Sequence, residues 1–369
     1  MADSQVAACL PKSSQLTKQA FCLSNNQISE GLVLKPDKTR FRQRPSKMKA
    51  IVRTKYGPPE ILHLKDVERP TPTDDEVLIK VHAGSVNRSD WETLRGSPLY
   101  ARVGGFHQIL GSDIAGRVEM VGRNVRQFHP GDEVFGDILG RMGGFAEYVC
   151  ARERSLALKP AGLTFEQAAA IPQAAVIALQ GIRDKGQVKA GQKVLINGAG
   201  GGAGTFAVQL AKMYGAEVTG VDNTDKLDFM RSIGADHVID YAKEDFTKDG
   251  RQYDLILDVV ANRSVFAYKQ ALRPNGSYFA VGGSVAIFLQ ILLLGPLIRL
   301  TSGRRIRILA VQPSLKDMVH MAELCEGGKV RLAIDRYYPL AEAAEAIRYL
   351  GEGRVRGKVV IIVESEAES

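Results

Sequence analysis

The stretch that decides the fold is Val194-Leu-Ile-Asn-Gly-Ala-Gly-Gly-Gly-Ala-Gly204. An apolar strand pattern leads into the glycines, a helical pattern follows them, and Asp222 ends the next strand pattern. A glycine-rich turn alone indicates only a turn, but this context with a later acidic residue is typical of dinucleotide binding. Two registers of the motif fit the sequence: Gly198-x-Gly200-x-x-Ala203 and Ala199-x-Gly201-x-x-Gly204.

Each small residue of this loop has an expected task. Ala199 or Gly200 would open the tight turn. Gly201 and Gly202 would let the backbone approach a pyrophosphate, while Gly204 would let the helix pack closely on the strand. The amides at the helix start would then hold the phosphates, because they lie at the positive end of the helix dipole.

Asp222 would lie at the adenosine end of the cofactor. A carboxylate there accepts hydrogen bonds from the ribose and repels a 2′-phosphate, which gives a slight lean towards NAD. Asn223, Thr224 and Lys226 follow at once and could receive that phosphate, so NADP stays open. As an alternative, Asp222 caps the helix that begins near Asp225.

From residue 193 onwards, apolar strand patterns alternate with amphipathic helical patterns. Strands that are apolar throughout predict a parallel sheet covered by helices on both faces. The expected strands cover residues 194–197, 217–222, 237–239, 255–260 and 278–281, with helices at 204–214 and 226–233.

The chain before and after this region has a different pattern. Short β patterns separated by Gly, Pro, Asp and Asn indicate a compact, barrel-like β domain. Residues 164–185 have a helical period, and the chain ends with two helical patterns and a strand. The expected strands are 49–53, 77–82, 114–121, 132–136, 145–150 and 358–363, and the late helices are 316–325 and 340–350.

Composition limits the function classes. With 369 residues, 45% hydrophobic and 24% charged, the chain is expected to fold into about two globular domains. The net charge is +8, but residues 1–47 hold eight Lys or Arg against three Asp or Glu, which accounts for +5 of it. The remaining +3 is ordinary, so nucleic acid is not expected as the main ligand.

Residues 1–47 are expected to be a disordered tail, and the folded protein is expected to start at Met48. This segment has no apolar core of a secretory signal, and the four cysteines are far apart and fit reduced thiols, so a cytoplasmic location is predicted. No run of about 18 apolar residues occurs, so no membrane span is predicted. The nearest candidate, residues 285–298, is interrupted by Gln290, Gly295 and Pro296.

At this point the chain resembles the medium-chain dehydrogenase/reductase superfamily, in its quinone oxidoreductase-like (zeta-crystallin-like) branch. The resemblance covers almost all of residues 48–363 and rests on several motifs in the same order. They are Met48-Lys-Ala-Ile-Val, Tyr56-Gly-Pro-Pro-Glu60, Ala83-Gly-Ser-Val-Asn-Arg-Ser-Asp90, Leu110-Gly-Ser-Asp-Ile-Ala-Gly116, Pro130-Gly-Asp-Glu-Val134, Gly143-Gly-Phe-Ala-Glu-Tyr148, Gly234-Ala-Asp-His-Val-Ile-Asp-Tyr241 and Gly357-Lys-Val-Val360.

The resemblance implies an α/β fold in which a Rossmann doubly wound parallel sheet is inserted into a GroES-like β-barrel catalytic domain. The first part of the catalytic domain would cover residues 48–170, the Rossmann domain 171–309, and the return to the catalytic domain 310–369. The cofactor would then lie in the cleft between the two domains.

The chain departs from the zinc-dependent alcohol dehydrogenases of this superfamily. The position of the first catalytic zinc ligand holds Asn87, and the histidine position holds Ser112. No Cys occurs between residues 23 and 149. Because tetrahedral zinc needs Cys, His or carboxylate ligands, a zinc-free enzyme is predicted.

Without a Lewis acid, a conjugated carbonyl is the more accessible hydride acceptor, because its developing negative charge spreads over several atoms. The prediction is therefore NAD(P)H-dependent reduction of a small hydrophobic electrophile, either a quinone or another activated alkene. Asn87 is the candidate hydrogen-bond donor to the substrate oxygen, with a simple turn residue as the alternative. Tyr100 is the second candidate, as a proton donor, with half-buried packing as the alternative.

The resemblance also implies the cofactor contacts. Gly201, Gly202, Ala203 and Gly204 would meet the pyrophosphate, and the adenosine end would meet the residues after the second strand. The implied set at the adenosine and nicotinamide ends is Asp222, Asn223, Thr224, Lys226, Tyr241, Val260, Ala261 and Gly282.

Other readings stay open. Residues 285–300 would line a hydrophobic substrate cleft or form the contact of a homodimer, or else form a buried helix with neither role. The arginines at positions 299, 304, 305 and 307 also allow a peripheral membrane contact. The alternative activities are an enoyl-thioester reductase and a non-enzymatic NAD(P)H-binding protein of a crystallin-like or nucleic-acid-associated kind.

Overall fold

The computed structural model describes residues 46–363, so the predicted disordered tail 1–47 lies almost entirely outside the described residues. The glycine loop belongs to a six-stranded sheet in which every pairing is parallel, in the order β10-β9-β8-β11-β12-β13. This is the strand order of a dinucleotide-binding fold. The strands are β8 (Lys193–Asn197), β9 (Glu217–Asp222), β10 (His237–Asp240), β11 (Tyr253–Asp258), β12 (Leu272–Ala280) and β13 (Arg305–Ile308).

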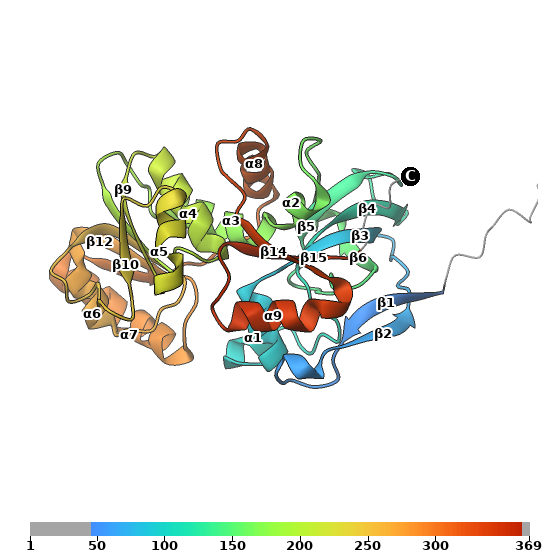
Figure 1. Cartoon of the computed structure of the whole chain (residues 1–369), viewed down its shortest axis with the longest axis horizontal. Helices are drawn as coiled ribbons and strands as arrows, with labels where there is room; N and C mark the ends of the chain where they lie inside the picture. Colours follow the sequence, from blue (N-terminus) through green and yellow to red (C-terminus); the bar gives the residue numbers. More distant parts are fainter. Residues whose placement is uncertain (1–45, 364–369) are drawn as a thin grey trace, which may run out of the picture. The chain divides into compact units, whose positions relative to one another are not determined.

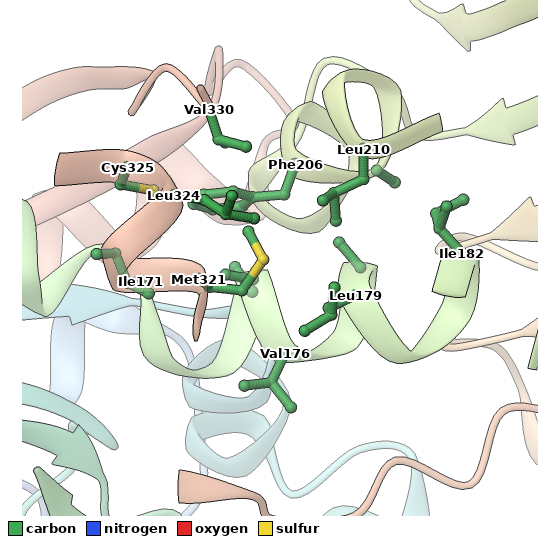
Figure 2. Packing of buried hydrophobic residues seen from close by; sticks show 14 of the residues in the cluster. Ile171, Val176, Leu179, Ile182, Phe206, Leu210, Met321, Leu324, Cys325 and Val330 are labelled. Atoms are coloured by element: carbon green, nitrogen blue, oxygen red, sulfur yellow. The ribbon is translucent and has the colours of Figure 1, made fainter. Parts of the chain in front are cut away.

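Both faces of this sheet are covered, because successive strand residues point to opposite sides. Val194 and Ile196 pack into one hydrophobic cluster with helices α3, α4 and α8, whereas Leu195 packs into another with α6 and α7. Figure 2 shows side chains of α3, α4 and α8 meeting in the first cluster. These helices are α3 (Pro172–Leu179), α4 (Gly202–Met213), α6 (Val265–Ala271), α7 (Val285–Ser302) and α8 (Leu315–Glu326), and α5 (Leu227–Ser232) follows β9.

The remaining strands form a seven-stranded mixed sheet and a two-stranded antiparallel sheet (Figure 1). The larger sheet has the order β14-β15-β3-β4-β5-β7, with β6 also paired to β3. Strands β14 and β15 come from the C-terminal part of the chain, so the chain returns to this sheet after it has completed the parallel one. The strands are β1 (Lys47–Val52), β2 (His63–Glu68), β3 (Glu76–Val86), β4 (Asp113–Val121), β5 (Glu133–Asp137), β6 (Tyr148–Arg152), β7 (Leu156–Leu158), β14 (Ile334–Pro339) and β15 (Lys358–Ile362).

Short helices connect these strands. Helix α1 packs against α9, and α2 packs against the mixed sheet. They are α1 (Arg88–Arg95), α2 (Phe165–Ala169) and α9 (Ala343–Gly351), and a π-helical turn (Gln180–Lys185) continues α3. The predicted α/β architecture with a doubly wound parallel sheet and a β-rich part is confirmed.

Several predicted boundaries are wrong, and some elements were not predicted. The strand expected at 255–260 ends at Asp258, because Asp258 itself holds a turn in the next three residues. The strand expected at 145–150 begins only at Tyr148. β2, β7, β13, β14, α1 and α6 were not predicted from the sequence.

The apolar stretch 285–300 forms the single helix α7, with Pro296 inside it. The alternative of a buried helix is wrong, since only Ile287, Ile291, Gly295 and Ile298 are buried. Within residues 46–363, α7 is the helix that is long and apolar enough to cross a membrane by length and composition, and 22% of it is buried. In the sequence, this stretch was the nearest candidate for a membrane span and was set aside because Gln290, Gly295 and Pro296 interrupt it, but the helix continues through all three.

Candidate cofactor and substrate site

The glycine loop turns sharply where β8 ends. Gly198 has a φ of +83°, a conformation that glycine adopts without strain, and its N–H donates to the Val221 carbonyl at 2.8 Å. The turn is therefore opened by Gly198, and the expectation that Ala199 or Gly200 opens it is wrong. The reason is that β8 continues to Asn197, so the first residue free to turn is Gly198.

Gly204 lies where α4 passes closest to this loop. A Cβ atom added there would lie 2.1 Å from the Gly198 oxygen and 2.7 Å from the Ala199 Cα. A Cβ added at Gly201 would meet only the Gly198 oxygen, at 3.4 Å, which is ordinary contact. The loop thus leaves an open cradle at the N-terminus of a 12-residue helix, which fits a pyrophosphate.

A cavity with a volume of ≈ 1300 Å³ begins at this cradle. It continues past the carboxyl ends of the parallel strands to the start of α1 in the mixed-sheet part of the chain. The predicted site residues that line it are Asn87, Tyr100, Gly201, Gly202, Ala203, Asp222, Lys226, Tyr241, Val260, Ala261 and Gly282. The predicted residues that do not line it are Ala199, Gly200, Gly204, Asn223 and Thr224.

Asp222 is held by the glycine loop and by a lysine. Its Oδ2 accepts a hydrogen bond from the Gly200 N–H at 3.0 Å, and its Oδ1 lies 3.2 Å from the Lys226 ammonium. Both side chains are buried. The interpretation of Asp222 as a helix cap is wrong, because the 3-10 turn at Thr224–Lys226 follows Asn223 and no side chain caps it.

The side chains of the two residues after Asp222 form hydrogen bonds with other parts of the chain. The Thr224 hydroxyl donates to the Asp240 carboxylate, and the Asn223 side-chain amide donates to the Gly353 carbonyl at 3.4 Å. Tyr241 is half exposed at the rim of the cavity. Of the phosphate-binding candidates after β9, Lys226 alone presents a charge to the cavity.

A buried carboxylate that the sequence reasoning missed shapes the loop after β11. Asp258 Oδ1 accepts hydrogen bonds from the N–H groups of Val260 at 3.0 Å and Ala261 at 2.7 Å. These bonds hold Ala261 at a φ of +35°, which a residue with a side chain rarely adopts. The loop is thereby fixed where its backbone faces the cavity.

At the other end of the cavity, Asn87 lies between β3 and α1 and meets a buried lysine. Its side-chain Nδ2 donates to the Ser112 hydroxyl at 3.4 Å, and its Oδ1 accepts from the Lys358 ammonium at 2.5 Å. That ammonium also lies 3.6 Å from Asp113 Oδ2. Lys358 was missed because its only sequence signal was the Gly357-Lys motif at the start of the last strand.

Burial governs the ionisation of this cluster. It lowers the pKa of Lys358, opposed by the negative charge of Asp113, and it raises the pKa of Asp113 itself. The pKa of Asp90, behind Asn87, is raised by burial to about 7. Burial also raises the pKa of Asp137, on the cavity wall, to about 7.

Asp90→Asn is expected to flatten the pH dependence of stability. A folded-state pKa of about 7 against 3.8 means that the stability linked to Asp90 is full below pH 3.8 and is lost as the pH rises through about 7. Urea unfolding at a series of pH values measures this slope. The exposed Asp225→Asn is the control that should keep the wild-type slope, and an unchanged slope in Asp90→Asn would contradict the prediction.

Tyr100 faces the first turn of α7. Its hydroxyl donates to the Gly283 carbonyl at 3.1 Å, and its ring lies 5.7 Å from that of Phe288. Burial, with the Glu92 charge as a second cause, raises the pKa of Tyr100 to about 12, so the phenol is protonated at neutral pH. The proton is engaged by a backbone carbonyl, and the ring narrows the cavity beside Phe288.

The Asn87 and Ser112 positions thus carry an amide and a hydroxyl next to a fixed ammonium group. Among residues 46–363, no three side chains of His, Cys, Asp or Glu are grouped so that they could hold a metal ion. Cys150 and Cys325 are buried free thiols, and Cys9 and Cys22 lie outside the described residues.

Two family models match the chain. "Alcohol dehydrogenase GroES-like domain" matches residues 73–161, and "Zinc-binding dehydrogenase" matches residues 233–361. The chain is 34% identical to the "2-methylene-furan-3-one reductase" of Solanum lycopersicum, over 86% of the chain and 79% of that protein. It is 32% identical to the Mus musculus protein named "NAD(P)H oxidoreductase RTN4IP1, mitochondrial", over 87% and 90%.

A solved structure has the same fold. The quinone oxidoreductase from Coxiella burnetii matches with a TM-score of 0.79 and 32% identity, over 86% of this chain and 100% of that one. The match therefore includes both the parallel sheet and the mixed sheet.

Proposed function

Because the chain belongs to the medium-chain dehydrogenase/reductase superfamily, in its quinone oxidoreductase-like branch, we propose that it reduces quinones and other conjugated carbonyl compounds with NADH or NADPH. The observation that carries the proposal is one cavity that joins the glycine loop to the Asn87–Lys358 pair. When bound, the dihydronicotinamide supplies a hydride to the acceptor carbon and is oxidised, and a proton from water completes the reduced product.

The chain's own residues position the reactants in this proposal. The amides at the start of α4 bind the pyrophosphate, and the backbone of Val260 and Ala261 supports the nicotinamide end. The apolar wall beside Phe288 and Trp91 excludes water from the acceptor. These contacts favour a small hydrophobic electrophile over a charged substrate.

Asn87 meets the acceptor oxygen in this proposal. An ammonium group has only donors, so the Asn87 carboxamide must turn its oxygen towards Lys358. The amide nitrogen is then fixed on the other side, where it donates to the Ser112 hydroxyl and also lies close enough to the Asp113 carboxyl to lower its pKa. Because Asn87 lines the cavity, we propose that an amide hydrogen turns from these partners to the acceptor oxygen and stabilises the negative charge that develops there.

Asn87→Ala tests this assignment. We expect kcat with a quinone or enone acceptor to fall by about 100-fold, as on the loss of an oxyanion donor, while the Kd for the cofactor is unchanged. Stopped-flow absorbance of NADH and NADPH measures both the turnover and its insensitivity to a chelator.

Ser89→Ala is the matched control, because Ser89 lines the same wall but its hydroxyl donates to Gln173. Full turnover in Asn87→Ala would remove Asn87 from the reaction. Failure of the wild-type protein to oxidise either cofactor with any quinone or enone would refute the proposed function itself.

We further propose that both NADH and NADPH are accepted. The Asp222 carboxylate that favours NAD is paired with the Lys226 ammonium, so its repulsion of a 2′-phosphate is offset.

Lys226→Met is expected to weaken NADPH binding by about tenfold more than NADH binding, since one charge-assisted contact is lost. Parallel titrations of the two reduced cofactors measure the ratio, and an equal loss for both would contradict a phosphate contact. Asp222→Ser should move the ratio towards NADPH.

The proposal also covers the domain bounds, the oligomeric state and the cellular compartment. The catalytic domain would cover residues 48–170 and 310–369 and the Rossmann domain 171–309, in keeping with the strands of the two sheets. We propose a homodimer in the cytoplasm, and light scattering of the purified chain tests the mass. The mitochondrial name of one relative means that the family itself fixes no compartment.

A further inference from the structure

Helix α7 carries an apolar face that points away from the protein. Five leucines on it are between 52% and 85% exposed: Leu289, Leu292, Leu293, Leu297 and Leu300. Their spacing of three and four residues places them on one side of the helix. Helices α6 and α7 lie side by side over one face of the six-stranded sheet (Figure 1).

The opposite side of α7 is already fully packed. Ile287, Ile291 and Ile298 are buried in the cluster between the helix and the sheet. A Cβ added at Gly295 would lie 2.6 Å from the Ile306 oxygen, so the helix lies in direct contact with β13. The outward leucines therefore form a second apolar face, in addition to the face of α7 that packs on the sheet.

The sequence around α7 carries charges of one sign, although Arg263 and Arg273 pair with Asp245 and Asp254 from outside it. Residues 259–316 contain no Asp or Glu. At the end of the helix, Arg299 is exposed and Arg304 donates to the Leu272 carbonyl, and neither guanidinium pairs with a carboxylate among residues 46–363. The basic residues of the acid-free stretch are Arg263, Lys269, Arg273, Arg299, Arg304, Arg305, Arg307 and Lys316.

We propose that α7 docks on a lipid bilayer that contains anionic headgroups, with its exposed leucines in the headgroup and acyl boundary. A helix with an exposed apolar face and cations beside it is the form that lies in such an interface. A second copy of the chain fits less well, because its own stretch 259–316 contains no Asp or Glu that could pair with Arg299.

The docking would also deliver substrate to the cavity, because α7 begins at the cavity wall; this consequence rests on the proposed function. Ser284 and Phe288, at the start of the helix, line the cavity. The leucine face begins at the next residue, Leu289. A lipophilic acceptor dissolved in the bilayer would therefore meet the cavity without crossing water.

Flotation of the full chain with vesicles tests the docking. Vesicles of phosphatidylcholine are compared with vesicles of phosphatidylcholine and phosphatidylserine. We expect binding to the anionic vesicles, weakened by salt and reduced at least about tenfold in Leu293→Gln/Leu300→Gln, because two inserted side chains are lost. Arg299→Gln should reduce it several-fold, and Leu158→Gln, which changes a leucine 58% exposed on β7, should leave it intact.

None of the substituted residues in the vesicle experiment lines the cavity. All variants should therefore reduce a water-soluble quinone at the wild-type rate, whether or not they bind vesicles. This measurement separates a failure of the docking from a failure of the proposed function. Equal binding by wild type and Leu293→Gln/Leu300→Gln would overturn the docking and point to the basic tail. Absence of vesicle binding would also overturn it, and a dimer that dissociates in the leucine variant would assign the face to a second copy.

Discussion

Gly204→Ala is expected to abolish measurable binding of NADH and NADPH. The added Cβ would lie 2.1 Å from the Gly198 oxygen, and no rotamer change can relieve a clash with backbone. Either α4 or the loop must shift, and the cradle at the helix N-terminus is lost in both cases. Overpacking of this kind costs about 1–3 kcal/mol, so the chain should still fold. Fluorescence enhancement of the reduced cofactor measures binding, and thermal unfolding measures the change in Tm.

Gly201→Ala separates loop distortion from blocked access. Its Cβ would meet only ordinary contact at 3.4 Å, so its Tm should stay near that of the wild type. Because Gly201 lines the cavity, we expect weaker cofactor binding all the same. Wild-type affinity in Gly204→Ala would show that the cofactor does not bind at this loop. Wild-type affinity in Gly201→Ala alone would indicate that the pyrophosphate lies nearer Gly202 and Ala203 than Gly201.

The parallel sheet could be predicted because its information is local. The apolar strands and the glycine loop lie within one continuous stretch, and the carboxylate that ends β9 follows soon after. The position of the turn could not be fixed, because five of the seven residues from Gly198 to Gly204 are glycine and two registers fit equally. Only the backbone shows that Gly198 turns and that Gly204 packs.

The substrate end of the site depends on contacts that no local pattern reveals. Asn87 and Lys358 are 271 residues apart in the sequence and meet because β15 pairs with β3. Likewise, α7 is apolar on every side, so the sequence could not tell which face the sheet covers. The structure resolves this through the close approach of Gly295 to β13.

Lys358→Met is expected to lower both stability and turnover. It removes the cation that faces Asp113 and Asn87, and breaking a buried ion pair at one partner costs about 3–5 kcal/mol. Because burial raises the pKa of Asp113, protonation relieves this loss at low pH, so the loss should be larger at pH 8 than at pH 5. Urea unfolding at the two pH values measures it.

The double variant Asp113→Asn/Lys358→Met decides what Lys358 does for the reaction. Removal of both charges should restore most of the stability, because no unpaired carboxylate remains. It should not restore kcat, since the Asn87 carboxamide no longer has an ammonium to fix its orientation. The KM for the acceptor should change little in comparison, because the apolar wall beside Phe288 is untouched. Recovery of full kcat in the double variant would reduce Lys358 to a charge partner of Asp113, and Asn87 would then be oriented by Ser112 alone.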